Sequence, residues 1–383
     1  MASKRPNSRR SKGNGNEPRI RYAVVGLGWI AQSAILPAFA QARKNSELTA
    51  LVSDDATKLK ALSQRYGVEK RYPYDEYSRC LEDPDLDAVF IALPNTMHRA
   101  YSEAAARAGK HVLCEKPMAM TEKDCQAMID TCREADVKLM IGYRLHFEKA
   151  NLAAAELAQS GRLGELRLFD SVFTQDVEEG NLRLRGAEGG PLFDIGIYCL
   201  NAARSIFRAE PLEVSAWHES RSCDARFAEV AEMTAARLRF PGDRLAQFVC
   251  GFGASPVSQF EVVGTKGVLH VSPAFGIAED LVHCLTINER TTTKTFPARD
   301  QFAPELLEFS DCVQTGREPE PSGEEGLADV RVLEAIDESA RTGRPVKLAH
   351  FERARHPDMS QEIRRPLGSK PELVHAGSPN RES

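Results

Sequence analysis

Residues 20–43 read IRYAVVGLGWIAQSAILPAFAQAR, a short β-branched run followed by a glycine-rich turn and an alanine-rich stretch. The run predicts a strand at residues 21–25, and the stretch after the turn predicts a helix at residues 30–43. In a GxGxxA turn between a strand and a helix, glycine backbones let a pyrophosphate approach the helix N-terminus. This position favours a dinucleotide site over a turn that only packs tightly. The residues expected to contact the cofactor here are Gly26, Gly28, Trp29 and Ile30.

The same alternation of strand and helix continues to residue 142. It predicts further strands at residues 48–53, 88–93, 111–115 and 138–142, and helices between them at 56–66, 98–108 and 122–135. Because each crossover between parallel strands needs a helix, the pattern predicts a doubly wound parallel sheet. We therefore expect an α/β protein with an N-terminal Rossmann dinucleotide-binding domain over residues 19–142.

The pattern changes after residue 142. Helices are predicted at 147–160 and near 192–207, and strand-like segments then follow one another from 212 to 296 without helices between them. Consecutive strands joined by hairpin turns indicate antiparallel pairing. With helices returning at 304–315 and 326–342, we expect an α+β substrate and oligomerisation domain over residues 143–350 with a large open, mostly antiparallel sheet. Residues 1–18 are expected to be a disordered basic arm, and residues 351–383 a polar, partly disordered tail.

Composition excludes several classes of protein. The chain has 383 residues, 42% of them hydrophobic and 27% charged, which is typical of globular proteins and long enough for two domains. Its net charge of -5 disfavours nucleic acid as a partner. No apolar run reaches the ~18 residues of a membrane span, and no apolar segment follows the basic N-terminus as in an export signal. Nine cysteines without metal-ligand spacing predict reduced thiols, no metal site and a cytoplasmic location.

The end of the second predicted strand bears on cofactor choice. An acid at this position binds the ribose 2'-hydroxyl of NAD, but here the residue is Ser53. Ser53 suits a 2'-phosphate, and Lys58 in the next helix would neutralise its charge. Asp54 and Asp55 leave an alternative open, because either would bind a ribose hydroxyl or simply start the helix. We predict NADP in preference to NAD.

Two more strand ends carry polar residues. The loop after the third main strand, at the edge where open α/β sheets bind ligands, contains Leu93, Pro94, Asn95 and His98. The alternative is that Asn95 or Thr96 serves only as a helix cap. Glu115 and Lys116 end the next strand. An ammonium at that edge donates to a substrate oxygen and favours the anionic form of a neighbouring hydroxyl, whereas most lysines are solvated surface charges.

The segment from Gly189 to Tyr198 reads GGPLFDIGIY. A helix that begins near Pro191 places Asp194 and Tyr198 one turn apart on one face. An Asp and a Tyr on a mainly apolar helix need partners or a cavity. The alternative is a buried Asp bonded to backbone with the Tyr hydroxyl at the surface, and Lys116 is the reason to prefer a site.

The GLGWIA turn, the EKP after a strand and the GGPLFDIGIY helix together resemble the glucose-fructose oxidoreductase, inositol dehydrogenase and rhizopine catabolism protein family. The chain is most similar to its glucose-fructose oxidoreductase and NADP-dependent aldose dehydrogenase branch. The similarity runs from about Arg21 to Leu348 and includes GYRLHFEKANLAA, QFEVVGTKGVL and SGEEGLADVRVLEAI. It leaves out both tails.

The resemblance implies roles for individual residues. Lys116 and Tyr198 would act at the reacting carbon, with Asp194 orienting them, and Ser53 and Lys58 would hold the 2'-phosphate. It also implies that Arg183 contacts the substrate. Further cofactor contacts implied by it are Leu93, Pro94, Asn95, His98, Glu115 and Arg144. The chain departs from the sugar-oxidising relatives, which often carry a Trp-Arg pair and a third glycine where it has Leu182-Arg183 and Glu188-Gly189-Gly190, so the sugar pocket is expected to differ.

The expected function is hydride transfer between a nicotinamide and a carbinol or carbonyl carbon of a small sugar or polyol. The reaction expected is oxidation at C1 of an aldose to a lactone, or oxidoreduction between two sugars. The alternatives are a dihydrodiol or other polyol dehydrogenase, and a non-catalytic NADP-binding sugar or redox sensor. By resemblance, the outer face of the second sheet would make a homo-oligomer, a dimer or a tetramer.

Overall fold

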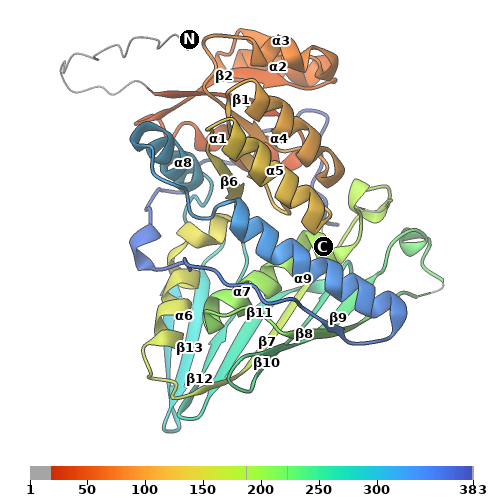
Figure 1. Cartoon of the computed structure of the whole chain (residues 1–383), viewed down its shortest axis with the longest axis vertical. Coiled ribbons are helices and arrows are strands. Elements are labelled where there is room, and N and C mark those ends of the chain that lie inside the picture. Colours follow the sequence, from red (N-terminus) through yellow and green to blue (C-terminus); the bar gives the residue numbers. More distant parts are fainter. Residues whose placement is uncertain (1–18, 187, 222, 382–383) are drawn as a thin grey trace, which may run out of the picture.

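The computed structural model describes residues 19–186, 188–221 and 223–381, so the predicted basic arm at residues 1–18 lies outside the described residues (Figure 1). The N-terminal sheet has six parallel strands in the order β3-β2-β1-β4-β5-β6. The order in which the strands are added reverses between β1 and β4, which makes this a doubly wound sheet with its ligand crevice at that switch point. The predicted fold class is confirmed. The strands are β1 (Ile20–Val25), β2 (Ser46–Val52), β3 (Lys70–Tyr72), β4 (Ala88–Ile91), β5 (His111–Glu115) and β6 (Leu139–Gly142).

Both faces of this sheet are buried. Along β1, Ala23 and Val25 pack into one apolar cluster, while Tyr22 and Val24 pack into another on the opposite face. The second cluster includes residues of α8 (Ala303–Thr315), which comes from the far end of the chain, and the Tyr22 hydroxyl lies 2.7 Å from Ser310 Oγ. Helices of the N-terminal half supply the rest of the cover. They are α1 (Leu36–Ala38), α2 (Ala56–Tyr66), α3 (Tyr77–Leu81), α4 (His98–Arg107) and α5 (Glu122–Glu134).

The helix predicted at residues 30–43 is shorter than expected. A π-helical turn, η1 (Ala31–Ile35), follows the glycine turn and passes into α1, which ends at Ala38. Pro37 stands in the first turn of α1 and has no N–H to donate. A proline interrupts the regular backbone hydrogen bonds from residue i to residue i−4. Such an interruption is a common cause of a wider helical turn next to the proline.

The second sheet has nine strands in the order β14-β13-β12-β11-β7-β10-β9-β8-β15, and only the β7–β10 pair is parallel. Helices α6 (Lys149–Gln159), α7 (Ile197–Phe207) and α9 (Gly323–Thr342) lie on one face (Figure 1). The other face is open. The strands are β7 (Leu166–Asp176), β8 (Glu213–Glu219), β9 (Met233–Phe240), β10 (Arg244–Gly251), β11 (Gly253–Gly264), β12 (Gly267–Val271), β13 (Leu281–Ile287), β14 (Arg290–Phe296) and β15 (Val346–Lys347).

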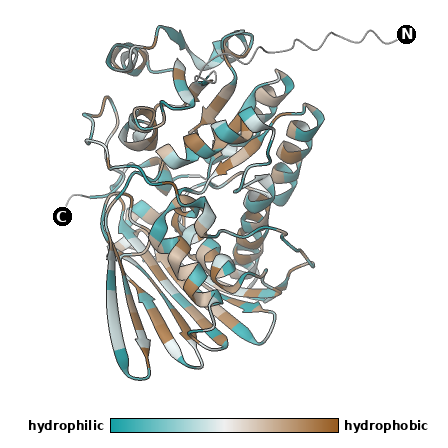
Figure 2. Cartoon of the chain, turned by 90° about the vertical axis from the view of Figure 1, so that its left-hand side faces the viewer, coloured by the Kyte–Doolittle hydropathy of each residue, from teal (hydrophilic) through white to brown (hydrophobic). Residues whose placement is uncertain are grey.

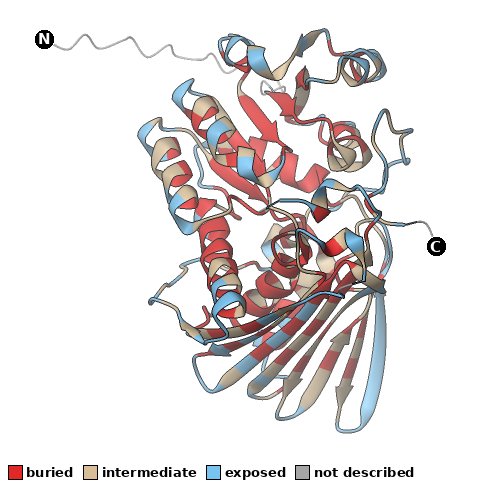
Figure 3. Cartoon of the chain, turned by 90° about the vertical axis from the view of Figure 1, so that its right-hand side faces the viewer, coloured by how far each residue is buried: buried red, intermediate tan, exposed pale blue. Residues whose placement is uncertain are grey.

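The open face of this sheet carries exposed apolar side chains among exposed polar ones. Hydrophobic and hydrophilic residues alternate along its strands (Figure 2), and exposed and intermediate residues alternate with buried ones (Figure 3). Trp217 and Leu245 are 50% and 54% exposed there, and Val249 is 37% exposed. In the described part of the chain no helix is both long and apolar enough to cross a membrane.

The chain after β15 returns to the N-terminal half. Residues 351–381, for which the sequence predicts only partial order, contain almost no regular structure but are bonded to both halves of the protein. The Arg353 guanidinium pairs with Glu320 and Glu325, and Arg365 Nε donates to the carbonyl of Gln41. The tail therefore crosses the molecule with fixed contacts at several points.

Candidate active site

A cleft of about 680 Å³ lies between the carboxyl edge of the Rossmann sheet and the second domain. Its volume is within the range of small-molecule and cofactor sites, ~300–1,000 Å³. The first domain lines it with residues of the glycine turn and of the ends of β4 and β5. The second domain adds residues of β7, β11 and the segment before α7. Predicted site residues among those that line it are Trp29, Ile30, Leu93, Asn95, Glu115, Lys116, Arg144, Arg183, Asp194 and Tyr198.

The glycine turn fits a dinucleotide. Gly26 has φ +93°, and a side chain there would overlap the carbonyl oxygen of Ala92 in the neighbouring segment. At Gly28, by contrast, a side-chain carbon would meet no atom within 4 Å. This open space lies directly before η1, where backbone N–H groups face an incoming anion. Gly26 therefore shapes the turn, and Gly28 leaves room for a pyrophosphate.

After the end of β2, Asp54 and Asp55 each accept a hydrogen bond from a backbone N–H. Asp55 caps α2 by accepting from Lys58 N at 3.0 Å, and Asp54 Oδ1 accepts from Tyr74 N at 2.7 Å. Ser53 Oγ accepts from Asp55 N at 3.3 Å. The Lys58 ammonium forms no ion pair with any described residue. This arrangement fits a 2'-phosphate, because Ser53 offers a hydroxyl and Lys58 a cation, while one oxygen of each aspartate already accepts from a backbone N–H.

The loop after β4 contributes Leu93 and Asn95 to the cleft, whereas Pro94 is not among the lining residues. The prediction that His98 contacts the cofactor needs correction. His98 is fully buried, with its ring nitrogens 2.8 Å from the carbonyl of Pro117 and 2.9 Å from the carbonyl of Leu93. Its imidazole joins the loops after β4 and β5, so its effect on a cofactor is indirect.

Lys116 points into the cleft and is held by Asp194. Its Nζ donates to the backbone carbonyl of Asp194 at 2.8 Å and to Oδ1 at 3.1 Å, while Asp194 Oδ2 lies 3.0 Å from Arg183 Nε. Burial alone would raise the pKa of Asp194, but the charges of Arg183 and Lys116 outweigh it and lower that pKa. Burial alone would lower the pKa of Lys116. The electrostatic interactions of its ammonium with Tyr198 and Asp194 outweigh burial and raise that pKa. Lys116 is therefore a fixed cation at neutral pH.

Tyr198 lies between two cations. Lys116 Nζ and the Arg144 guanidinium are each 4.9 Å from its ring centroid, and Arg144 Nε donates to the Tyr198 hydroxyl at 3.2 Å. Phe173 and Phe275 pack against the ring at centroid distances of 5.7 and 6.0 Å. Arg144, expected only as a cofactor contact, is thus a direct partner of Tyr198.

Hydrogen bonds to three other residues hold the Arg144 guanidinium in place. Its Nη2 donates to the carbonyl of Phe275 at 2.7 Å and its Nη1 to that of Gly276 at 3.3 Å, and the same group bonds the side chain of Gln301. A guanidinium held on three sides keeps the direction of its remaining N–H. The Tyr198 hydroxyl therefore has one set orientation relative to the cleft.

The helix that carries Asp194 and Tyr198 is not regular. Leu192–Gly196 form a π-helical turn, η6, and α7 begins at Ile197. A side-chain carbon at Gly196 would come within 2.9 Å of Cys250 Sγ, so the glycine allows this wide turn to press against β10. The sequence predicts an ordinary helix here. A π-turn changes which side chains share a face, and such turns are frequent at functional sites.

Buried carboxyl groups flank the site. Burial raises the pKa of Glu115 to about 7 despite the nearby charge of Lys116. Glu305 in α8 is fully buried, neither of its carboxylate oxygens has a hydrogen-bond partner among the described residues, and burial with the charge of Glu115 raises its pKa well above the usual range. The sequence contains no signal for Glu305, because its helix joins the Rossmann domain only through tertiary packing.

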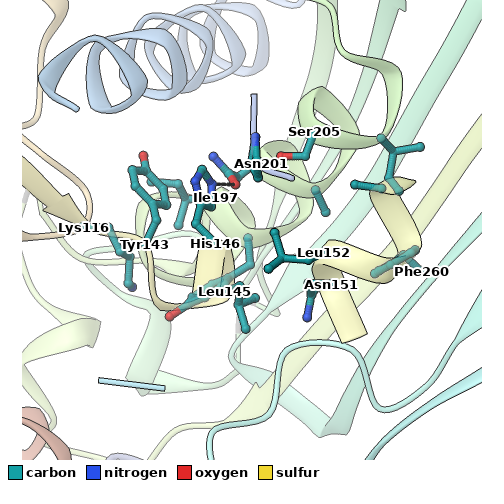
Figure 4. A pocket seen from close by; sticks show the side chains of 15 residues that line it. Lys116, Tyr143, Leu145, His146, Asn151, Leu152, Ile197, Asn201, Ser205 and Phe260 are labelled. Atoms are coloured by element: carbon teal, nitrogen blue, oxygen red, sulfur yellow. Dashed lines mark hydrogen bonds between the residues drawn. The ribbon is translucent and has the colours of Figure 1, made fainter. Parts of the chain in front are cut away.

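Behind α7 lies a small, mostly apolar cavity whose lining is shown in Figure 4. His146 and Asn201 are bonded there at 2.9 Å, and the amide of Asn201 also donates to Glu325 and Asp329. Arg204 of α7 pairs with the same two carboxylates at 2.8 and 2.6 Å. This buried network anchors α7 to α9, and sequence reasoning did not identify it.

Comparison with known proteins places the chain among oxidoreductases with a Rossmann domain. Residues 20–143 match the model of an oxidoreductase family with an NAD-binding Rossmann fold, GFO_IDH_MocA, and residues 151–270 match the GFO/IDH/MocA C-terminal domain. The chain is 34% identical over 338 residues to the D-xylose 1-dehydrogenase (NADP(+)) of Haloarcula marismortui, an alignment that covers 86% of this chain and 93% of that protein.

Solved structures show the same relationship. The aldose-aldose oxidoreductase from Caulobacter crescentus, complexed with glycerol, has a TM-score of 0.82 and 40% identity, covering 86% of this chain and 100% of that one. KijD10, a 3-ketoreductase from Actinomadura kijaniata in complex with TDP-benzene and NADP, has a TM-score of 0.75 and 27% identity, covering 84% of this chain and 98% of that one. This chain therefore belongs to the GFO/IDH/MocA oxidoreductase family.

Proposed function

We propose that this chain is an NADP-dependent sugar oxidoreductase that transfers a hydride at C1 of an aldose and yields a lactone. One observation carries the proposal. The Tyr198 hydroxyl, the Lys116 ammonium and the Asp194–Arg183 pair meet in the cleft at the carboxyl edge of the Rossmann sheet. The named activities of the D-xylose dehydrogenase and the aldose-aldose oxidoreductase support a sugar as substrate.

NADP is the cofactor because the residues at the end of β2 suit a phosphate. Ser53 offers a hydroxyl and Lys58 a cation without an ion pair among the described residues, whereas Asp54 and Asp55 each accept from a backbone N–H. Gly28 leaves space for the pyrophosphate, and Glu115 and Asn95 line the cleft near the reacting end. When bound, the nicotinamide supplies the acceptor or donor of the hydride.

The side chains supply proton transfer and orientation. Tyr198 takes the proton of the C1 hydroxyl as the hydride leaves, and returns it in the opposite direction. Arg144 holds the Tyr198 hydroxyl, and Lys116 donates to the substrate oxygen while Asp194 fixes its position. Since the Lys116 ammonium stays protonated, it stabilises negative charge at the oxygen and does not compete for the proton.

The reaction is tested with a panel of aldoses, ketoses and dihydrodiols, each assayed for reduction of NADP⁺ or oxidation of NADPH by absorbance. We expect an aldose to reduce NADP⁺ with a lactone as product. The panel includes pairs of one oxidisable and one reducible sugar without free cofactor, because a retained cofactor would hide turnover of single sugars. Binding of NADPH without turnover of any sugar would favour the sensor, and activity confined to dihydrodiols would favour a polyol dehydrogenase.

We also propose that the open face of the second sheet forms a homo-oligomer. Trp217, Leu245 and Val249 present apolar surface on strands β8 and β10 that lie side by side with β9. Exposed patches of this kind mark association sites. The Leu245→Lys variant would then sediment as a smaller species than wild type, and a wild-type protein that sediments only as a monomer would reject the interface. All nine cysteines are free, which fits a reducing compartment such as the cytoplasm.

A further inference from the structure

The C-terminal segment of residues 372–381, called the strap below, runs from the glycine turn to the end of β7 and lines the cleft with Pro379 and Asn380. At one end, Val374 makes two bonds with the side chain of Gln32, its N–H donating at 2.8 Å and its carbonyl accepting at 2.9 Å. Gln32 is fully buried in η1, directly after the glycine turn, and also donates to the carbonyl of Leu27 in that turn. The strap is thus tied to the turn that would hold the pyrophosphate.

Two further contacts place this end beside the adenosine ribose position. His375 Nδ1 lies 3.1 Å from Asp55 Oδ2, next to Ser53 and Lys58, and Arg65 of α2 donates to the carbonyl of Glu372 at 2.6 Å. The imidazole of His375 is largely exposed, so it can turn from Asp55 towards an anion. A 2'-phosphate held by Ser53 and Lys58 would lie within the same group of residues.

The other end of the strap reaches the substrate side. Asn380 forms a backbone bridge with Val177 after β7, Glu178 N donates to the carbonyl of Pro379 at 3.0 Å, and Arg381 N donates to that of Asp176 at 2.8 Å. Pro379 and Asn380 line the cleft, and Asn380 Oδ1 is buried without a hydrogen-bond partner among the described residues. A buried amide oxygen without a partner is costly, so a ligand donor at this point would stabilise it.

The strap therefore spans the cleft from the glycine turn to β7. Val374 and Asn380 are six positions apart in the sequence, and a fully extended chain of this length covers at most about 20 Å. A dinucleotide lying along the carboxyl edge of the Rossmann sheet would leave the cleft only after one of these anchors opened.

We propose that the strap is part of the cofactor site and retains NADP(H) between turnovers, with His375 as a further contact of the 2'-phosphate. This proposal rests on the proposed function and deepens it, because a retained cofactor suits oxidoreduction between two sugars. One sugar then loses the hydride of C1 and its hydroxyl proton and becomes a lactone. A second sugar takes the hydride at its carbonyl carbon and the proton at its carbonyl oxygen, which balances both atoms and electrons.

The experiment measures the rate at which bound NADPH leaves the protein, followed by the loss of NADPH fluorescence on mixing with excess NADP⁺. The test variants are Val374→Pro, which removes the N–H that Gln32 accepts, and a chain that ends at residue 370. Loss of one to two such bonds is expected to accelerate release about tenfold or more. Val374→Ala is the matched control, because it keeps the backbone N–H, and its release rate should stay close to wild type.

A second arm compares NADPH with NADH. His375→Ala should weaken binding of NADPH and leave binding of NADH unchanged, because only NADPH carries the 2'-phosphate. Release of NADPH at the wild-type rate from Val374→Pro would overturn the strap as a retaining element even if the shortened chain does not fold. Equal effects of His375→Ala on both cofactors would overturn its 2'-phosphate contact. Failure of the full-length protein to turn over any sugar would instead count against the proposed function, since the release assay needs no substrate.

Discussion

Replacement of Tyr198 by phenylalanine tests the central assignment, because it removes one oxygen and leaves the ring. The ring remains packed against Phe173 and Phe275, so its position should not change. The lost hydroxyl accepts a hydrogen bond from Arg144, which keeps its bonds to the carbonyls of Phe275 and Gly276. The cost in folding free energy should therefore be only about 1 kcal/mol.

The cost in rate should be much larger. A general acid or base contributes about 10²- to 10⁴-fold, which corresponds to roughly 3–5 kcal/mol of activation free energy. We expect the upper half of this range, because the neighbouring Lys116 has a raised pKa, remains protonated at neutral pH and cannot replace Tyr198 as base. NADPH binding should be unchanged, since the hydroxyl bonds Arg144 and not the end of β2.

The assay compares initial rates of sugar oxidation with the NADPH dissociation constant from fluorescence titration. Tyr143→Phe is the matched control. Tyr143 is a buried tyrosine one residue before Arg144, and its hydroxyl faces Asp329 and does not line the cleft. It should keep near wild-type turnover. If Tyr198→Phe also turned over sugar at the wild-type rate with normal cofactor binding, the assignment of Tyr198 as proton acceptor would be refuted.

Three further outcomes follow from the site. Asp194→Asn removes the carboxylate that faces Arg183 and Lys116, so kcat/KM for the sugar should fall and the pKa of Lys116, read from the pH profile, should decrease; an unchanged profile would show that Asp194 does not act on Lys116. Lys58→Ala should weaken NADP(H) roughly 10- to 100-fold while hardly affecting NAD(H), and Ser53→Asp should shift preference towards NAD(H), as measured by titration with each cofactor. A wild-type protein that binds NAD(H) at least as tightly as NADP(H) would contradict both. Burial raises the pKa of Glu115 in the folded protein to about 7, above the ordinary value of 4.5, so its protonated form contributes stability that is present below the lower value and lost as pH rises through the higher one. The melting temperature of the cofactor-free protein should accordingly fall more steeply with pH in wild type than in Glu115→Gln, and parallel curves would argue against this titration.

Prediction from the sequence was most successful where the cause is local. The glycine turn, the strand at residues 111–115 and the helix at 56–66 are found with the predicted bounds. Each depends on side chains within a few residues of one another, such as an apolar period, the Asp55 cap or a turn glycine. The three-residue edge strand β3 was not predicted, since it is too short to show a period.

Prediction from the sequence also grouped three residues that the structure places close together. Lys116, Asp194 and Tyr198 were expected to act as a unit, and the structure places the three side chains in one cleft. Parallel strands end at a common edge, so a motif at a strand end has a known position before any contact is known. The pairings within the unit were not predictable in the same way.

Tertiary packing alone decided the remaining contacts. The bond from Arg144 to Tyr198 joins residues 54 positions apart, the Lys116 and Asp194 pair is separated by 78 positions, and the Gln32 and Val374 pair by 342. His98 turned inward to two carbonyls, and Glu305 became buried beside Glu115, only because the loops and α8 pack over the sheet. Sequence patterns record which side chains are buried or lie at a strand end, because these follow from the local period of the backbone. Which distant partner each buried polar group finds depends on how whole elements pack, and that information exists only in the folded chain.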